Sequence, residues 1–465
     1  MAIWLILIYV IAQIALAAWA GRGTRSDTDY LLAGRQLGTF AVAMSVFATW
    51  FASESLIATS GEVARDGLAG GRAEPFAYAI GIFAIGLFFA HRLRSGKHIT
   101  LAGMLRTRFG PGCETLAAIV IALSATTWSA AQLYAFATII AAASPLDFPA
   151  ALAGATILVM TYTLFGGLAG DVLTDMVQGA IMVVGITILL GLMVHAFGGL
   201  EATIAAAPPA AWQFTTPDES WINQAELWLI PIIGTMVSQE ALARTFGARS
   251  ANVARRGALA GGAIYLVVGL IPICLGIFGP ALAAQLGIAL GEGDAFLPSL
   301  AEALFPPWLY IIFTGALVSA ILSSVDSALL AVSAVATETG YRRIRPDAPP
   351  KAMLRAARIA TIGAALIAAL VAASGESLRS LVLGASAIAA VLAIPIIAGL
   401  ASISSSGRAA MVAIIVQGAV LAVLDWWLGV PGAFLWMLAS GLIAFAVLAW
   451  LDRGPHNTTA AFPHT

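Results

Sequence analysis

Charged side chains are scarce in this chain, where they make up 10% of the residues against 60% for apolar ones. The mean hydropathy is +0.94, and the charges stand in short clusters between long apolar runs. A water-soluble chain of 465 residues could not bury so much apolar surface. The composition therefore predicts a chain that spans a bilayer, in which any ionisable residue inside an apolar run marks a functional position.

Other absences exclude whole classes of function. The two cysteines, Cys113 and Cys274, form neither a disulfide framework nor a metal-binding spacing. A net charge of −1 gives no basis for nucleic-acid binding. The chain has no Walker, kinase or glycine-rich phosphate motif, so an ATP-driven pump is not expected. His195 alone among the histidines lies well inside an apolar run, without the partners that a membrane-embedded enzyme needs, so we expect no enzyme.

Long apolar runs are what the chain does contain. A spanning helix needs about 20 mainly apolar residues, and about 13 segments meet that length. The first segment is either a secretory signal or a retained helix, and its basic flank after the apolar run favours the retained helix. The segments are 2–20, 38–60, 74–91, 113–143, 148–168, 174–197, 227–245, 257–279, 304–338, 358–374, 378–400, 409–427 and 432–451.

The basic residues predict how these segments are oriented. With an outside amino terminus, all of the 23 Lys and Arg residues fall on the inside except Arg65, Arg72 and Arg379. The longest outer loop, roughly 198–226, has no basic residue. This positive-inside pattern predicts an outside amino terminus and a cytoplasmic carboxyl terminus in a multi-pass protein of the plasma membrane, the inner membrane in a bacterium.

Two segments contain features that interrupt a helix. The second carries Glu54 in a stretch of small and polar residues, which predicts either a structural glutamate near the outer interface or a substrate site. The seventh contains Pro231 and Gly234, which indicate a kink or a break. The two segments lie five apart, and interrupted helices in corresponding halves are typical of an inverted-repeat transporter.

The ninth segment offers a cluster of oxygen ligands. Ser323, Asp326 and Ser327 share one helix face, and Ser324 lies beside it. Serines that bond back to the preceding turn would explain the hydroxyls, but Asp326 needs a proton, a cation or a partner. Asp175 in the sixth segment is a candidate partner, whereas we expect Asp171 at its start to be solvated.

Four stretches together resemble the sodium/solute symporter family, which includes bacterial transporters for proline, sialic acid and sugars and the animal sodium/glucose cotransporters. The stretches follow one another along essentially the whole chain. They are Ala48 to Gly61, Tyr162 to Gln178, Ser238 to Arg244 and Ser319 to Leu330.

The resemblance implies an all-α integral membrane protein of about 13 transmembrane helices with a LeuT-like five-plus-five inverted-repeat core. Residues 1–35 would form a first peripheral helix and link, 36–402 the core of ten helices, and 403–465 two peripheral helices and a short tail. The implied partners are sodium, a small solute and the lipid bilayer, and the core could function as a monomer.

The resemblance also implies the positions of the sites. Sodium would bind the backbone carbonyls of Ala48, Phe51 and Ala320 and the hydroxyls of Ser323 and Ser324. A second ion site would use Asp175, Ser323, Asp326 and Ser327, with an aspartate at 326 where some relatives carry a neutral group. Contacts to the substrate would come from Trp50, Ser53, Glu54, Ser55, Trp128, Gln132, Gly234 and Ser238.

These residues predict a sodium-coupled symporter that imports a small solute by alternating access. Glu54 and Trp50 favour an amino acid such as proline or another zwitterion, and a carboxylate stays open. Trp50 departs from the small or acidic residue that several relatives carry, and Gly234 departs from the aromatic residue of the sugar transporters, so both disfavour a sugar. A tryptophan such as Trp128 is more often an interfacial or packing residue than a substrate contact. The alternatives are a proton-coupled symporter of the same fold, favoured by the extra acid, and a transporter-like sensor, which the short polar tail after Asp452 disfavours.

Overall fold

The computed structural model is built of helices. It describes residues 11–13, 15–16, 19–23, 26–52, 54–96, 98–216, 219–374, 377–403 and 405–452, without the side chains at 23, 27, 28, 142, 143, 162, 165, 166, 316, 319, 320 and 323. Across this part of the chain the only strand-like pairing is an isolated bridge between Leu37 and Ala248. The first predicted span, 2–20, falls largely outside the described residues.

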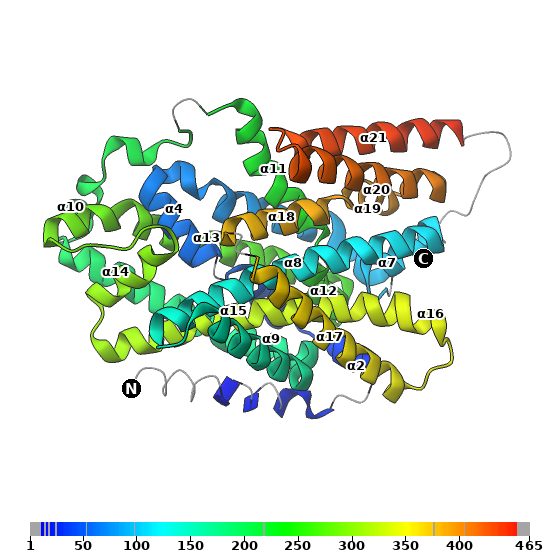
Figure 1. The fold of residues 1–465 in the computed structure, drawn as a ribbon, viewed down its shortest axis with the longest axis horizontal. Coiled ribbons are helices and arrows are strands. Elements are labelled where there is room, and N and C mark those ends of the chain that lie inside the picture. The colour runs from blue at the N-terminus through cyan, green and yellow to red at the C-terminus, as the bar shows by residue number, and fades with distance from the viewer. Residues whose placement is uncertain are drawn as a thin grey trace.

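Long helices run in roughly the same direction through the molecule (Figure 1). By length and composition, seven helical stretches of the described chain could cross a membrane, or up to eight if the bent pair α18 and α19 is one span. Large apolar side chains such as Leu123, Val184 and Ile367 point outward, as expected of helices that face lipid. The seven stretches are Glu54–Ser95, Pro111–Ala141, Gly167–Ala196, Ala251–Leu286, Pro350–Ala372, Gly407–Trp427 and Ala433–Leu451. The long single helices are α8 (Pro111–Ala143), α9 (Phe148–Ala196), α13 (Ala251–Leu286), α15 (Pro307–Val335), α17 (Pro350–Ala372), α20 (Gly407–Leu421) and α21 (Ala433–Leu451).

The other predicted spans are divided into shorter helices. They comprise α3 (Thr39–Trp50), α4 (Thr59–Asp66), α5 (Tyr78–Ala84), α6 (Ala90–Ser95), α11 (Trp221–Val237), α12 (Gln239–Gly247), α18 (Leu378–Ala390) and α19 (Ala393–Leu400). Short helices connect them: α2 (Asp27–Leu32), α7 (Leu101–Phe109), α10 (Leu200–Ala206), α14 (Phe296–Leu304) and α16 (Arg342–Ile344).

The second predicted span is interrupted in its middle. α3 ends at Trp50, and Phe51 has the non-helical dihedrals φ −90° and ψ 67°. The chain continues as a π-helical turn, η3 (Glu54–Ala58), and then as α4. Because the last four carbonyls of a helix have no partner within it, this break presents backbone oxygens in the interior of the bundle.

The seventh predicted span is also interrupted, but not where Pro231 and Gly234 predicted. Both residues lie inside α11, and the break falls at Ser238, whose dihedrals are φ −72° and ψ 131°. A proline can remain within a membrane helix when its surroundings satisfy the freed carbonyl. The location of this break is therefore a correction to the sequence-based expectation.

The fifth and sixth predicted spans join into α9, which turns sharply at Gly167. This residue has φ 56° and ψ −171°, and an added Cβ there would lie 2.7 Å from the Tyr30 ring. Both the positive φ and the close approach require glycine. The turn separates Phe148–Thr161 from the apolar stretch Gly167–Ala196.

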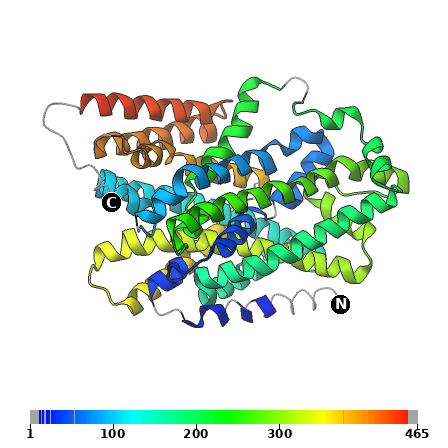
Figure 2. The same cartoon turned by 180° about the vertical axis from the view of Figure 1, so that it is seen from behind.

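The interior is formed where the broken helices meet the long ones. α13 packs along α3 and α4, α8 packs against α15 and α18, and α9 lies against α3 and α15. Figure 2 shows the molecule from behind, with the blue N-terminal helices against the green α13. The last two helices, α20 and α21, lie side by side at the edge of the bundle in both views.

Candidate functional site

The end of α3 and the middle of α15 meet at the break in the first interrupted helix. The Ser324 hydroxyl on α15 donates to the Thr49 carbonyl at 3.1 Å. The Ser55 hydroxyl donates to the Trp50 carbonyl at 2.7 Å, so two of the terminal carbonyls of α3 are used. The carbonyls of Ala48 and Phe51, which the resemblance assigns to sodium, belong to the same helix end.

Three predicted site residues cannot be placed in full. Ser53 lies outside the described residues, as do the side chains of Ala320 and Ser323. The backbone of residues 320 and 323 belongs to α15, one turn and one residue before Ser324, respectively, on the helix that also carries Asp326. The five proposed sodium ligands thus come from two neighbouring helices, and their coordination geometry stays a prediction.

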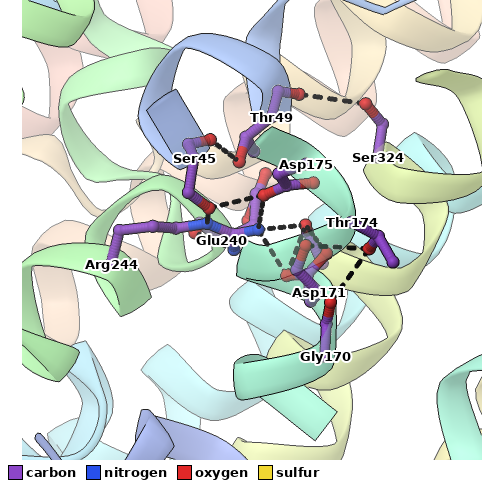
Figure 3. A network of polar contacts seen from close by, with 10 residues as sticks. Ser45, Thr49, Gly170, Asp171, Thr174, Asp175, Glu240, Arg244 and Ser324 are labelled. Carbon is purple, nitrogen blue, oxygen red and sulfur yellow. Dashed lines mark hydrogen bonds and ion pairs between the residues drawn. The ribbon is translucent and has the colours of Figure 1, made fainter. Parts of the chain in front are cut away.

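A buried ionic network lies next to this break, where α3, α9, α12 and α15 meet (Figure 3). The Arg244 guanidinium of α12 lies 2.5 Å from Asp171 and 3.4 Å from Asp175, both on α9. Its Nε donates to the Ser45 hydroxyl of α3 at 3.1 Å, and Ser45 in turn donates to Asp175 at 2.5 Å. Arg244 also contacts the Ser327 hydroxyl of α15.

Asp171 is a correction to the sequence analysis. Instead of being solvated, it is fully buried, and it accepts hydrogen bonds from Arg244 and from Ser327, the latter at 3.1 Å. Asp171 stands at the boundary of an apolar run, where a sequence cannot distinguish a solvated charge from one that a distant arginine neutralises. The sequence analysis missed the role of Arg244, because a basic residue at the end of an apolar run is ordinary, whereas the structure buries it fully.

Asp326 has a different environment from the other two aspartates. It is fully buried, and the polar side chain beside it is Thr163 of α9. The charges of Asp175 and Arg244 lie near it. Across the described residues, no group of three or more His, Cys, Asp or Glu side chains is placed to hold a metal ion.

Three aromatic rings are in contact at the end of α3, next to the break. The Trp50 ring centroid lies 5.0 Å from that of Trp128 on α8 and 5.1 Å from that of Tyr78 on α5. All three side chains are buried, and the indole N–H groups of both tryptophans have no hydrogen-bond partner in the part of the chain that is described. Three aromatic rings in contact, with polar edges still to be satisfied, can receive a polar or cationic group.

A carboxylate lies beside this aromatic group. Glu54 is buried, and the Gln132 amide of α8 donates to its Oε2 at 2.8 Å. Glu74 comes near enough for the two charges to interact, and Tyr265 of α13 donates to Glu74 at 3.2 Å. The Ser55 hydroxyl completes the group at 3.0 Å from the Tyr265 hydroxyl. The sequence analysis missed Glu74, Tyr78 and Tyr265. Glu74 has the non-helical dihedrals φ −124° and ψ 128°, so helical spacing could not have placed it beside Tyr78.

A cavity of about 40 Å³ lies next to Glu54 and Glu74. Its walls include Glu54, Glu74 and Tyr78 together with Glu62 and Arg379. Sites that hold a small molecule usually measure about 300–1,000 Å³, so this space is too small for an organic solute. In this structure, the space beside Glu54 is therefore closed to an organic solute.

The two predicted substrate residues of the seventh span lie in packing positions. A Cβ on Gly234 would stand 2.7 Å from the Ser386 carbonyl oxygen of α18, so this glycine allows α11 and α18 to approach closely. Ser238 is buried at the break before α12 and donates to the Thr235 carbonyl at 3.2 Å. Neither residue lines the cavity above Glu54.

The family of this chain follows from comparison with known proteins. The model of the family described as "Sodium:solute symporter family" matches residues 30–416. The chain belongs to this family. The resemblance noted in the sequence is thereby confirmed, and the protein is a multi-pass membrane transporter that couples sodium to a small solute rather than an enzyme.

Curated relatives of this symporter transport different solutes, as their names state. The sodium/pantothenate symporter of Escherichia coli is 26% identical over 73% of this chain and 72% of its own length. The osmoregulated proline transporter OpuE of Bacillus subtilis is 26% identical over 78% of this chain and 76% of its own length. The high-affinity choline transporter 1 of Drosophila melanogaster is 23% identical over 81% of this chain, which spans only 62% of that relative.

Solved structures confirm the predicted fold class of the symporter. A sodium-coupled sialic acid symporter in a substrate-bound outward-open state has a TM-score of 0.82, with 18% identity and coverage of 97% of this chain and 98% of that one. Mhp1, a nucleobase-cation-symport-1 family transporter in a closed conformation, has a TM-score of 0.60 with 17% identity, and the match covers 92% of this chain and 94% of that one. At these identities the likeness concerns the fold alone.

Proposed function

We propose that this symporter imports a small solute with a positively charged nitrogen, such as an amino acid or another zwitterion. The observation that carries this proposal is the buried Glu54 carboxylate beside the Trp50, Trp128 and Tyr78 rings. A buried carboxylate attracts a cationic group, and aromatic faces stabilise the same group through cation–π contacts. A solute with only a carboxylate would meet repulsion from Glu54 and Glu74.

The coupling ion in this proposal is sodium, bound between the broken end of α3 and the neighbouring helix α15. Its ligands would be the carbonyls of Ala48, Phe51 and Ala320 and the hydroxyls of Ser323 and Ser324. Hard cations prefer such oxygen ligands. Support comes from the hydrogen bond of Ser324 to Thr49, because it brings the two predicted sets of ligands together. Sodium at this position would join α3 to α15 and stabilise one arrangement of the bundle.

We further infer that a single sodium ion is coupled. The predicted second site at Asp175, Asp326 and Ser327 contains the Arg244 guanidinium, which contacts both Asp175 and Ser327. A side-chain cation there supplies the charge that a second sodium would otherwise bring. Proton coupling through Asp326 remains the alternative, favoured by the complete burial of that carboxylate.

The transport cycle follows from the closed cavity and the interrupted helices. The solute would enter when the outer half, η3 with α4, separates from α18, and would leave when α3 and α12 separate on the inside. We retain as proposals the orientation with an outside amino terminus in the plasma membrane, the core at residues 36–402, and function as a monomer.

Thermal unfolding of the purified protein in potassium buffer tests the sodium site. Sodium that binds the folded state must raise the melting temperature. We expect a sodium-specific rise in the wild type that is lost in Ser323→Ala with Ser324→Ala. Ser440→Ala is the matched control, since this hydroxyl donates to the Met437 carbonyl within the peripheral α21. No sodium-specific rise in the wild type would contradict sodium coupling and favour the proton.

A solute screen in the presence of sodium tests the proposed substrate class. We expect amino acids or other ammonium compounds to raise the melting temperature further, and Trp50→Ala to abolish that second rise while keeping the rise caused by sodium. Stabilisation by neutral sugars or by simple carboxylates alone would contradict the proposed class.

A further inference from the structure

One ion pair crosses the opening of the cavity above Glu54. Arg379 stands at the start of α18 and pairs with Glu62 of α4. Both side chains line the cavity, and they remain partly accessible, with 39% of the Arg379 side chain and 18% of the Glu62 side chain exposed. The pair therefore lies between solvent and the buried acids and aromatic rings.

The neighbouring ion pairs do not share this position. Arg65 pairs with its chain neighbour Asp66 at 2.7 Å on the surface, so that pair joins no two elements. Arg72 holds Glu219 through two hydrogen bonds of 2.7 and 2.8 Å, which fix the outer loop to the bundle. Of the described ion pairs, Glu62–Arg379 alone links α4 with α18 across the cavity.

The charges around this space are unequal. Glu54, Glu62 and Glu74 line the cavity, and Arg379 is the cationic side chain that lines it with them. A narrow space lined by an excess of carboxylates concentrates cations and repels anions. A solute ammonium group could replace Arg379 at Glu62 without leaving a buried carboxylate unpaired.

We propose that the Glu62–Arg379 pair is the outer gate of the solute path, with Glu62 as the entry site for a cationic nitrogen. Arg379 is the tethered cation that occupies Glu62 when the path is closed. The solute ammonium group displaces it, passes to Glu54 and the aromatic rings, and Arg379 then returns. The proposal rests on the proposed function for the identity of the solute, but the gate itself can be tested without transport.

The test measures how fast a cysteine inside the cavity reacts. Val382 is a suitable position because it is buried, lines the cavity and lies one turn after Arg379 on α18. The background carries Cys113→Ala and Cys274→Ala, and the full chain with Val382→Cys is purified in detergent. The reagents are a trimethylammonium-ethyl and a sulfonatoethyl methanethiosulfonate, which carry opposite charges.

We expect Arg379→Gln to speed modification by the cationic reagent about tenfold or more. The matched control Arg65→Gln, one turn from Glu62 on the same helix, leaves the rate unchanged. Adding Glu62→Gln to Arg379→Gln removes the preference for the cationic reagent but keeps the cavity accessible. Exchanging the two charges, with Glu62→Arg and Arg379→Glu, returns modification to the slow rate.

Two results would overturn the gate. One is an unchanged rate in Arg379→Gln, and the other is fast modification in the charge exchange when that variant elutes as a folded, monodisperse protein. Neither result depends on uptake. A failure of sodium-coupled uptake in the wild type would therefore count against the proposed function and would leave the gate standing.

Discussion

Arg244 is the residue that joins four helices in the interior of the bundle. Its guanidinium lies on α12 and reaches Ser45 on α3, Asp171 and Asp175 on α9, and Ser327 on α15. All of these side chains are buried. A guanidinium suits this position because its planar fork of five donors can satisfy several acceptors at once, which an ammonium group cannot match.

Removing this cation should strongly destabilise the protein. We expect Arg244→Gln to lower the free energy of unfolding by about 3–5 kcal/mol, because the variant leaves Asp171 and Asp175 buried without their cation. Arg244→Lys should recover only part of the loss. The measurement is denaturant or thermal unfolding in detergent.

The partner residue and a surface pair provide the controls for this prediction. Arg244→Gln combined with Asp171→Asn should be less destabilised than Arg244→Gln alone, since the pair is then removed together. Arg65→Gln, at the exposed pair with Asp66, should change stability by at most about 1 kcal/mol. Equal losses at Arg65 and Arg244 would show that the buried network contributes nothing specific.

The sequence alone pointed to Asp175 and Asp326 but not to Arg244 and Asp171, and the difference lies in where each residue stands relative to the apolar runs. Asp175 and Asp326 stand inside apolar runs, where a charge has a high cost and demands an explanation. Arg244 and Asp171 stand at the ends of such runs, where charges are ordinary. That they meet depends on contacts between α9 and α12, 73 positions apart along the chain, which no local pattern encodes.

At the scale of elements, the two interrupted helices were predictable in kind but not in detail. Small and polar residues at membrane depth predicted a break in the second span, and α3 does end at Trp50. In the seventh span the break lies at Ser238, and α12 begins after it as a separate helix. The first residue of that helix, Gln239, accepts a hydrogen bond from the Leu101 backbone N–H at 2.8 Å. A tertiary contact thus decided a boundary that proline alone did not.

Gly234 gives the clearest prediction about helix packing. Gly234→Ala should lower the free energy of unfolding by about 1–3 kcal/mol, because the new methyl group would overlap the Ser386 backbone of α18. Gly154→Ala in α9 is the matched control, since no atom lies within 4 Å of its added Cβ. A neutral Gly234→Ala would mean that α11 and α18 are less closely packed than the structure indicates. Melting temperatures of both variants provide the comparison.

At the scale of the whole molecule, the two ends of the bundle differ in their content of basic residues. The basic helices α7 and α16 lie at one end in Figure 1, and α10 and α14, which lack basic residues, lie at the other. Arg65, Arg72 and Arg379, predicted on the outside, are each paired with an acid. The orientation is predicted from the number of Lys and Arg residues on each side, and only these three of the 23 are predicted on the outside.

This arrangement predicts which end faces the cytoplasm. Ala210 and Asp347 are both exposed, Ala210 before α11 and Asp347 between α16 and α17. In a background with Cys113→Ala and Cys274→Ala, a membrane-impermeant thiol reagent applied to intact cells should label Ala210→Cys and spare Asp347→Cys. Inverted vesicles should give the opposite result. Labelling of Asp347→Cys in intact cells would reverse the proposed orientation, and the Glu62–Arg379 gate would then face the cytoplasm, since it lies at the same end as Arg65 and Arg72.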